Sequence, residues 1–138
     1  MAKKAVVDTN IVLSGLLSQK GAPGQILELW LDHHFIPIIS PEIEEEYFSV
    51  LYYDHIKNRL GKSFRLALQT LTSILRSAKR VYPKEKIKFF QDPRDDMLVE
   101  AAAIESADYI VSGDKSVLNA KEYKNIQILS ARAFLQNL

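Results

Sequence analysis

The fold of this chain is decided by residues 4–10, which read Lys4-Ala5-Val6-Val7-Asp8-Thr9-Asn10. The short apolar, β-branched run at 5–7 predicts a strand that is buried on both faces of a sheet. It is followed at once by Asp8 and then by a helical apolar pattern from Ile11 to Leu17. In open α/β sheets, ligands bind outside the carboxyl ends of the strands, which is where Asp8 falls. The alternative is that Asp8 or Asn10 only caps the following helix.

Length and composition indicate one soluble globular domain spanning residues 1–138. Hydrophobic residues make up 47% of the chain and charged residues 25%, which are ordinary values for such a domain. The 18 Lys and Arg against 17 Asp and Glu give a net charge of +1, so the overall charge indicates no particular partner. The chain has no cysteine, which excludes disulfides and thiolate metal sites and suits the cytoplasm. No apolar run is long enough to span a membrane, and the N-terminus does not resemble a signal peptide.

Strand and helix patterns alternate along the rest of the chain, with breaker residues at 18–24 and 61–63. Strands are predicted at 35–39, 80–83, 108–112 and 126–129, and helices at 25–32, 42–55, 64–78, 97–106, 115–119 and 131–135. The helices at 42–55 and 64–78 should form a hairpin that projects from the sheet. This alternation predicts an α/β fold with a parallel sheet covered on both faces.

Carboxylates recur where strands end and helices begin. Asp8 and Asp114 follow two different strands, so both should lie at one sheet edge. Within Glu44-Glu45-Glu46, helical phase places Glu46 beside the inward stripe of Ile43 and Val50, and Glu45 on the far side.

The same phase argument applies to the helix start at 92–96. Asp95 aligns with Leu98 and Val99 and is predicted to face the core, whereas Asp96 lies nearer the margin and Asp92 is an N-cap. Taken singly, each acid could be structural, since acids are favourable at helix starts.

Several carboxylates that share a small space need a cation, because like charges raise each other's pKa. Oxygen ligands without Cys suit Mg²⁺ or Mn²⁺, and His33-His34 is a poor metal pair because adjacent helical residues diverge. Such an ion can activate water towards a phosphodiester.

Four segments together resemble PIN-domain nucleases. They are Val6-Val7-Asp8-Thr9-Asn10, Ser40 to Tyr47, Asp92-Pro93-Arg94-Asp95-Asp96 with the alanine-rich helix after it, and Ala107 to Lys115. They occur in the family's order and cover essentially the whole chain.

The resemblance implies a Rossmann-like three-layer fold with about five parallel strands in the order 3-2-1-4-5. It also implies a Mg²⁺- or Mn²⁺-dependent ribonuclease whose catalytic and metal-binding acids would be Asp8, Glu46, Asp95 and Asp114. Asn10, Ser112 and Asp96 would support that site, with Ser112 standing where the family more often has threonine. Many small members resemble VapC toxins of toxin–antitoxin pairs, which implies an antitoxin partner and a homodimer.

Two other protein classes also place acids at the ends of parallel strands, and one alternative is not an enzyme. A haloacid-dehalogenase-type phosphatase needs a second acid two residues after the nucleophile, and this chain has Asn10 there. A receiver domain does not account for Glu46. The alternative that is not an enzyme is a catalytically silent PIN-fold protein that binds RNA or an antitoxin, which loss of an acid would favour.

The RNA backbone is expected to meet a local concentration of positive charge around Gly61 and at the start of the helix that follows 92. The residues are Lys57, Arg59, Lys62, Arg65 and Arg94. The alternative for these residues is an ordinary solvated surface.

Overall fold

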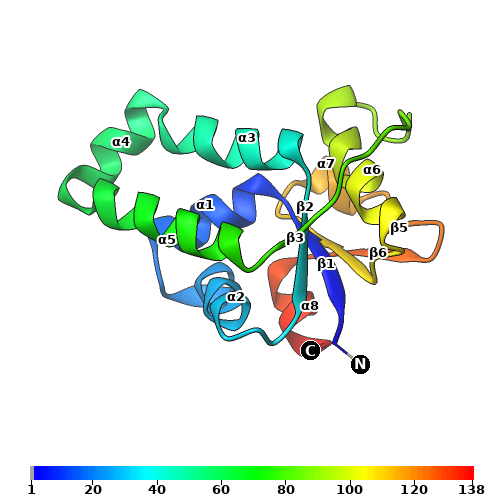
Figure 1. Ribbon diagram of the computed structural model, residues 1–138, viewed down its shortest axis with the longest axis horizontal. Coiled ribbons are helices and arrows are strands. Elements are labelled where there is room, and N and C mark those ends of the chain that lie inside the picture. The colour runs from blue at the N-terminus through cyan, green and yellow to red at the C-terminus, as the bar shows by residue number, and fades with distance from the viewer. Residues whose placement is uncertain (1) are drawn as a thin grey trace.

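The computed structural model describes residues 2–138 as an α/β domain built on one sheet (Figure 1). The strands are β1 (Lys4–Val7), β2 (Ile36–Ile39), β3 (Lys79–Arg80), β4 (Tyr109–Val111), β5 (Glu122–Tyr123) and β6 (Ile126–Leu129). The α-helices are α1 (Thr9–Leu17), α2 (Gly21–Leu31), α3 (Pro41–Leu51), α4 (Asp54–Leu60), α5 (Phe64–Arg76), α6 (Asp96–Ile104), α7 (Lys115–Leu118) and α8 (Ala131–Gln136). Two 3₁₀ turns, η1 (Gly61–Ser63) and η2 (Pro93–Asp95), precede α5 and α6.

The sheet has six strands in the order β3-β2-β1-β4-β6-β5. Five of them are parallel and follow the predicted order, with β6 in the place of the fifth strand. The remaining strand, β5, was not predicted. It pairs with β6 in an antiparallel hairpin at the edge of the sheet. Two residues are too few to give a periodic signal, so the sequence pattern could not reveal it.

Strand β1 lies at the centre of the sheet because its side chains are apolar on both faces. Ala5, Val6 and Val7 are completely buried. Helix α6 packs on β1, β2 and β4, whereas α8 packs on β4, β6 and α2. Trp30 on α2 is also fully buried, and its indole Nε1 donates a 2.7 Å hydrogen bond to the carbonyl of Ile74. Helices therefore cover both faces of a buried parallel sheet, as expected.

The predicted helix at 42–55 is wrong at its C-terminal end. Helix α3 ends at Leu51, and the chain turns at Tyr52 and Tyr53 before α4, a separate helix that was not predicted, begins. A hairpin was predicted between the helices at 42–55 and 64–78, whereas in the structure it is α4 that packs on α5 after the turn η1, and these elements make one end of the molecule (Figure 1). We call α4, η1 and α5 the helical hairpin.

Two further predicted boundaries differ from the structure. Helix α2 begins at Gly21, inside the predicted loop at 18–24. Pro23 is compatible with this because its missing N–H lies in the first turn, where it would have no helical partner. Strand β3 covers only Lys79–Arg80 instead of 80–83.

No helix in the described part of the chain is long and apolar enough to cross a membrane.

Candidate active site

The site is organised by the carboxyl ends of β1 and β4. Val7 pairs with Val111 in the parallel register, and the backbone N–H of Asp8 donates to the carbonyl of Val111 at 2.8 Å. The next residues on the two strands, Asp8 and Ser112, are therefore neighbours. The strand-end position predicted for Asp8 is the position that the structure shows.

The Asp8 carboxylate is 6% exposed and is held by three donors. The Ser112 hydroxyl donates to Oδ2 at 2.7 Å, and the Thr9 backbone N–H donates to Oδ1 at 2.8 Å. The Asn10 amide reaches Oδ2 at 3.4 Å and accepts from the backbone N–H of Gly113 at 3.0 Å. Asp8 thus caps α1 and also presents a fixed carboxylate, so the cap interpretation does not exclude a site.

Helix α3 brings Glu46 to Asp8. The Ser40 hydroxyl accepts from Ile43 N at 3.3 Å and caps the helix, and the Tyr47 hydroxyl donates to the carbonyl of Val7. Glu46 accepts a hydrogen bond from the Thr9 hydroxyl, whereas Glu45 is exposed. The predicted phase of α3 is therefore confirmed. Thr9 therefore links Asp8 and Glu46. Thr9 is part of the motif at 6–10, but the motif alone gives it no role.

Asp114 lies at the start of α7. Its carboxylate accepts from the Ser116 backbone N–H at 3.0 Å and from the Ser116 hydroxyl at 2.9 Å, both at Oδ1. Its own N–H donates to the Ser112 hydroxyl at 3.1 Å. One hydroxyl, that of Ser112, therefore contacts both Asp8 and the backbone of Asp114.

The predicted orientations of Asp95 and Asp96 are reversed. Asp96 is the buried residue, 7% exposed, and its Oδ1 accepts from the N–H groups of Phe89 and Phe90 at 3.2 and 2.8 Å. Asp95 is half-buried and belongs to η2 instead of the packing face of α6. The predicted orientations assume an α-helix that already includes residue 95. In the structure residue 95 lies in a 3₁₀ turn, whose residues follow a different spacing.

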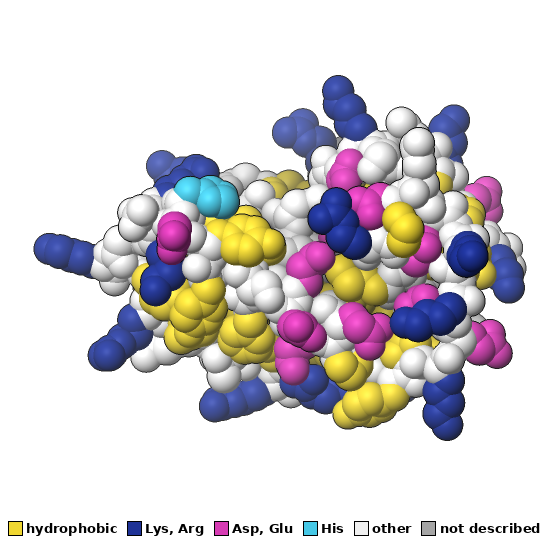
Figure 2. All heavy atoms as spheres, turned by 90° about the horizontal axis from the view of Figure 1, so that it is seen from above, with side chains coloured by type: hydrophobic (Ala, Val, Ile, Leu, Met, Phe, Trp, Pro, Cys, Tyr) yellow, Lys and Arg dark blue, Asp and Glu magenta, His cyan; other side chains and the backbone are white. Residues whose placement is uncertain are grey.

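Charge coupling shows that the four predicted acids face a common region. Burial raises the pKa of Asp95 to about 6, and the charges of Asp8, Asp92, Asp114 and Glu46 add to that shift. Burial likewise raises the pKa of Asp8, with smaller contributions from Glu46 and Asp114, against the lowering effect of its Ser112 and Thr9 hydrogen bonds. Figure 2, which looks down on the carboxyl ends of the strands, shows acidic side chains gathered across the middle of this face.

The donor set fits a hard divalent cation in its chemistry, although it does not form a closed cage. Carboxylate oxygens are the ligands that Mg²⁺ and Mn²⁺ prefer. The pKa of Asp95 is raised first by burial and then by the negative charge of its neighbours, and a bound cation would offset both effects. Across residues 2–138, however, no group of three or more His, Asp or Glu side chains is arranged to hold a metal ion as it stands. The four acids are within the range of Coulomb interactions but do not converge on one point.

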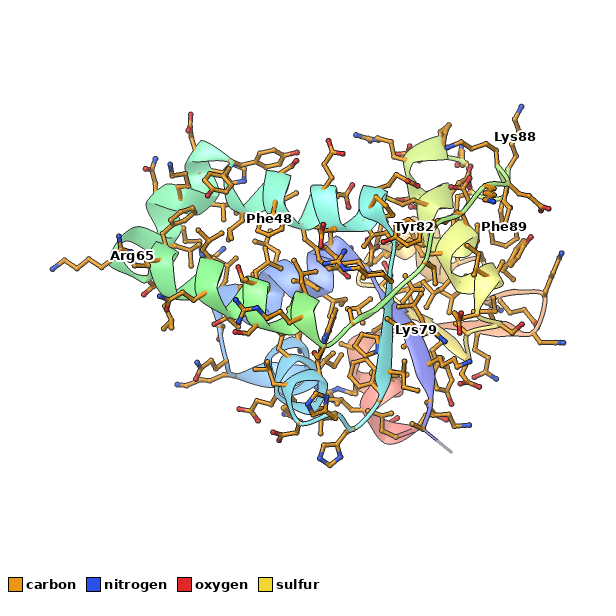
Figure 3. All side chains as sticks on the ribbon, viewed as in Figure 1. Phe48, Arg65, Lys79, Tyr82, Lys88 and Phe89 are labelled. Carbon is orange, nitrogen blue, oxygen red and sulfur yellow. The ribbon has the colours of Figure 1, made fainter. Side chains whose placement is uncertain are left out.

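The predicted RNA-binding residues divide into two sets. Arg94 lies next to the acids, where the charges of Asp95 and Glu46 act on it, and it is paired with Asp92 at 2.8 Å. The other four, Lys57, Arg59, Lys62 and Arg65, belong to the helical hairpin. Figure 3 shows Arg65 at its far end, pointing away from the molecule. Of the five, Arg94 is therefore the residue that lies beside the acids, and RNA contact by all five stays a prediction.

Comparisons with known proteins agree with this fold. Residues 4–116 match a family model described as PIN domain. A Methanocaldococcus jannaschii protein described only as uncharacterized protein MJ1680 is 28% identical over 119 residues, covering 86% of this chain and 76% of the relative.

Two solved structures share the architecture. PAE2754 from Pyrobaculum aerophilum superposes with a TM-score of 0.66 at 17% identity, covering 99% of this chain and 90% of that one. VapBC2 from Rickettsia felis, solved with a DNA fragment from the promoter, gives a TM-score of 0.60 at 14% identity, covering 92% and 98%. At these identities the two structures establish a common fold.

Proposed function

Because this chain belongs to the PIN domain family, whose members are generally nucleases, we propose that it is a metal-dependent endoribonuclease. The reaction is hydrolysis of an RNA phosphodiester, in which a water oxygen bonds to phosphorus while one P–O ester bond breaks and the leaving oxygen takes a proton. The observation that carries the proposal is that hydrogen bonds join three of the acids at the carboxyl ends of β1 and β4. The Ser112 hydroxyl contacts both Asp8 and the backbone of Asp114, and Thr9 contacts both Asp8 and Glu46.

The proposed cofactor is Mg²⁺ or Mn²⁺, held by those four carboxylates. When bound, such an ion activates water and stabilises charge on phosphate oxygens. The chain's own contribution is positioning: Ser112 and Thr9 fix the Asp8 carboxylate, and the Thr9 hydroxyl fixes Glu46. Asn10 ties Asp8 to the loop that carries Asp114 through Gly113. Asp96 acts more remotely, by holding the backbone at residues 89 and 90.

The test is cleavage of defined single-stranded RNAs with Mg²⁺, with Mn²⁺ and with a chelator. Metal-dependent cleavage by the parent, absent in Asp8→Asn, is the expected result. RNA binding without cleavage under any metal condition would instead favour the silent binding protein, an alternative motivated by the open arrangement of the acids.

We also propose that the protein is the toxin of a toxin–antitoxin pair and acts as a homodimer. Its fold likeness to VapBC2 supports the first part, and Leu31 at the end of α2, 41% exposed, is an apolar residue available to an interface. Growth arrest on expression, relieved by the product of an adjacent gene, would support the toxin assignment. Light scattering of the purified chain would measure its oligomeric state.

A further inference from the structure

A groove of about 700 Å³ leads from the acidic site along α3. Glu46 lines it, so the groove begins at one of the four acids. Its two walls are α3, continued by Tyr53, and the connector at 86–88 together with the start of α6. Any polymer chain that reaches Glu46 along the groove must pass between these walls.

The connector wall is held in place and carries positive charge. The buried Glu100 accepts from the backbone N–H of Ile87 at 3.0 Å. Asp96 accepts in the same way from the backbone N–H groups of Phe89 and Phe90. Ile87 is half-buried, while Lys86 and Lys88 on either side of it are exposed. Alternation along an extended segment therefore puts both lysines on the outer side, and Figure 3 shows Lys88 projecting outward from the connector.

The opposite wall has a different character. Glu42 and Glu45 line it from α3, so a phosphate chain would be repelled there. At its end stands Tyr53, 51% exposed, whose ring lies beside that of His55, 6.0 Å between ring centroids, and leaves about half of its surface open for stacking. The backbone carbonyl of Tyr53 accepts from Ile56 N and Lys57 N, both at 2.9 Å. These bonds do not use the side chain, so the ring is not needed for the turn into α4.

We infer that this groove binds a single strand of RNA, with phosphates on Lys86 and Lys88 and a base stacked on Tyr53. Lysines act as point charges towards phosphate, and exposed aromatic rings stack unpaired bases of any sequence. The acidic wall fixes the orientation, because the bases and not the phosphates must face α3. The inference rests on the proposed ribonuclease function and adds the substrate class and its path.

The experiment measures binding of a fluorescent single-stranded RNA by anisotropy, in the Asp8→Asn background so that the probe stays intact. Lys86→Ala/Lys88→Ala is expected to weaken binding about 10-fold and to lower the salt slope by roughly 1.4, about 0.7 for each lost phosphate contact. Its matched control is Lys84→Ala/Lys20→Ala, which removes the same charge from exposed positions outside the groove.

The stacking contact is tested in parallel. Tyr53→Ala should weaken binding at least about 5-fold, whereas Tyr53→Phe, which keeps the ring, should bind like the parent. Tyr82→Ala is the control, since Tyr82 is 66% exposed and lies outside the groove. A duplex of the same sequence should bind more weakly because its bases are already paired.

The outcomes separate the two proposals. If the parent cleaves RNA while the groove variants bind like their controls, the groove assignment is overturned and the nuclease stands. If the parent neither binds nor cleaves any RNA, both are overturned.

Discussion

The Ser112 hydroxyl donates a 2.7 Å hydrogen bond to the carboxylate of Asp8, although 104 positions separate the two residues in the chain. Both groups are buried, Ser112 completely. The bond crosses from β4 to β1 at the ends of the strands, and it opposes the upward shift that burial imposes on the Asp8 pKa. A carboxylate that is both buried and kept ionisable is suited to hold a cation.

Replacing Ser112 by alanine should therefore raise the Asp8 pKa further and weaken metal binding. We expect about a 10- to 100-fold loss of RNA cleavage at limiting Mg²⁺, the range found for residues that orient metal ligands. Ser112→Thr keeps the hydroxyl and should retain activity, with some loss of stability from the added methyl in a buried position. Equal cleavage by Ser112→Ala and the parent across a Mg²⁺ titration would contradict this role.

Asp8→Asn should abolish cleavage and leave the fold intact or slightly stabilised. The substitution removes a buried charge that Glu46 and Asp114 repel, and asparagine remains a good N-cap for α1. Thermal unfolding in a chelator and RNA cleavage in Mg²⁺ measure the two effects. An active variant would leave Asp8 with a capping role alone.

The neighbouring glutamates provide a matched pair. Glu46→Gln should reduce activity or metal affinity by at least about 10-fold, because Glu46 accepts from Thr9 beside Asp8. Glu45→Gln should change metal affinity little, since Glu45 is exposed in the groove and it is Glu46 that accepts from Thr9. The reverse ranking in a metal-binding titration would show that Glu46 is structural.

Without metal, the contribution of Asp95 to the stability of the parent should fall as the pH rises from about 4 to about 6. The pKa of Asp95 is raised from 3.8 to about 6 in the folded state. In that window the unfolded chain has released the proton that the folded chain still binds, so rising pH favours unfolding. Asp95→Asn removes the effect and should add on the order of 1 kcal/mol at pH 7.5, after allowance for solvent screening, and almost nothing at pH 3.5. Urea unfolding in a chelator tests this, and a gain that does not depend on pH would refute it.

The basic residues of the helical hairpin remain candidates for RNA contacts beyond the groove. The groove ends at Tyr53, just before α4 begins. On α4, the Nζ of Lys57 lies 5.2 Å from the ring centre of Phe64, the first residue of α5. We predict that Lys57→Ala/Lys62→Ala weakens binding of all RNA sequences alike and lowers the salt slope by roughly one unit per lost phosphate contact. Any cleavage preference should persist, because phosphate contacts carry no sequence information. An unchanged slope would mean that the hairpin is only a solvated surface.

Features that depend on local rules could be predicted from the amino-acid sequence. The apolar run at 5–7 is enough to place β1 at the centre of the sheet, because a strand without a polar face must be covered on both sides. Ser40 and Ser130 each stand directly before a helix, where serine is a preferred N-cap, and each accepts a backbone hydrogen bond from the residue three positions later. Helical periodicity also separated Glu45 from Glu46, since the stripe on α3 is unbroken around them.

Which side chains meet depends on how distant segments of the chain pack together. Asp95 and Asp96 could not be ranked from periodicity, because the difference arises from the connector, which folds back and places the N–H groups of Phe89 and Phe90 against Asp96. The groove likewise needs α3 and residues 86–88, which are more than 30 positions apart in the chain. Periodicity and capping describe one segment at a time, whereas burial and charge coupling depend on which segments pack together. For that reason the sequence identified the acids, and the packing of α3, α6 and the connector determined their surroundings.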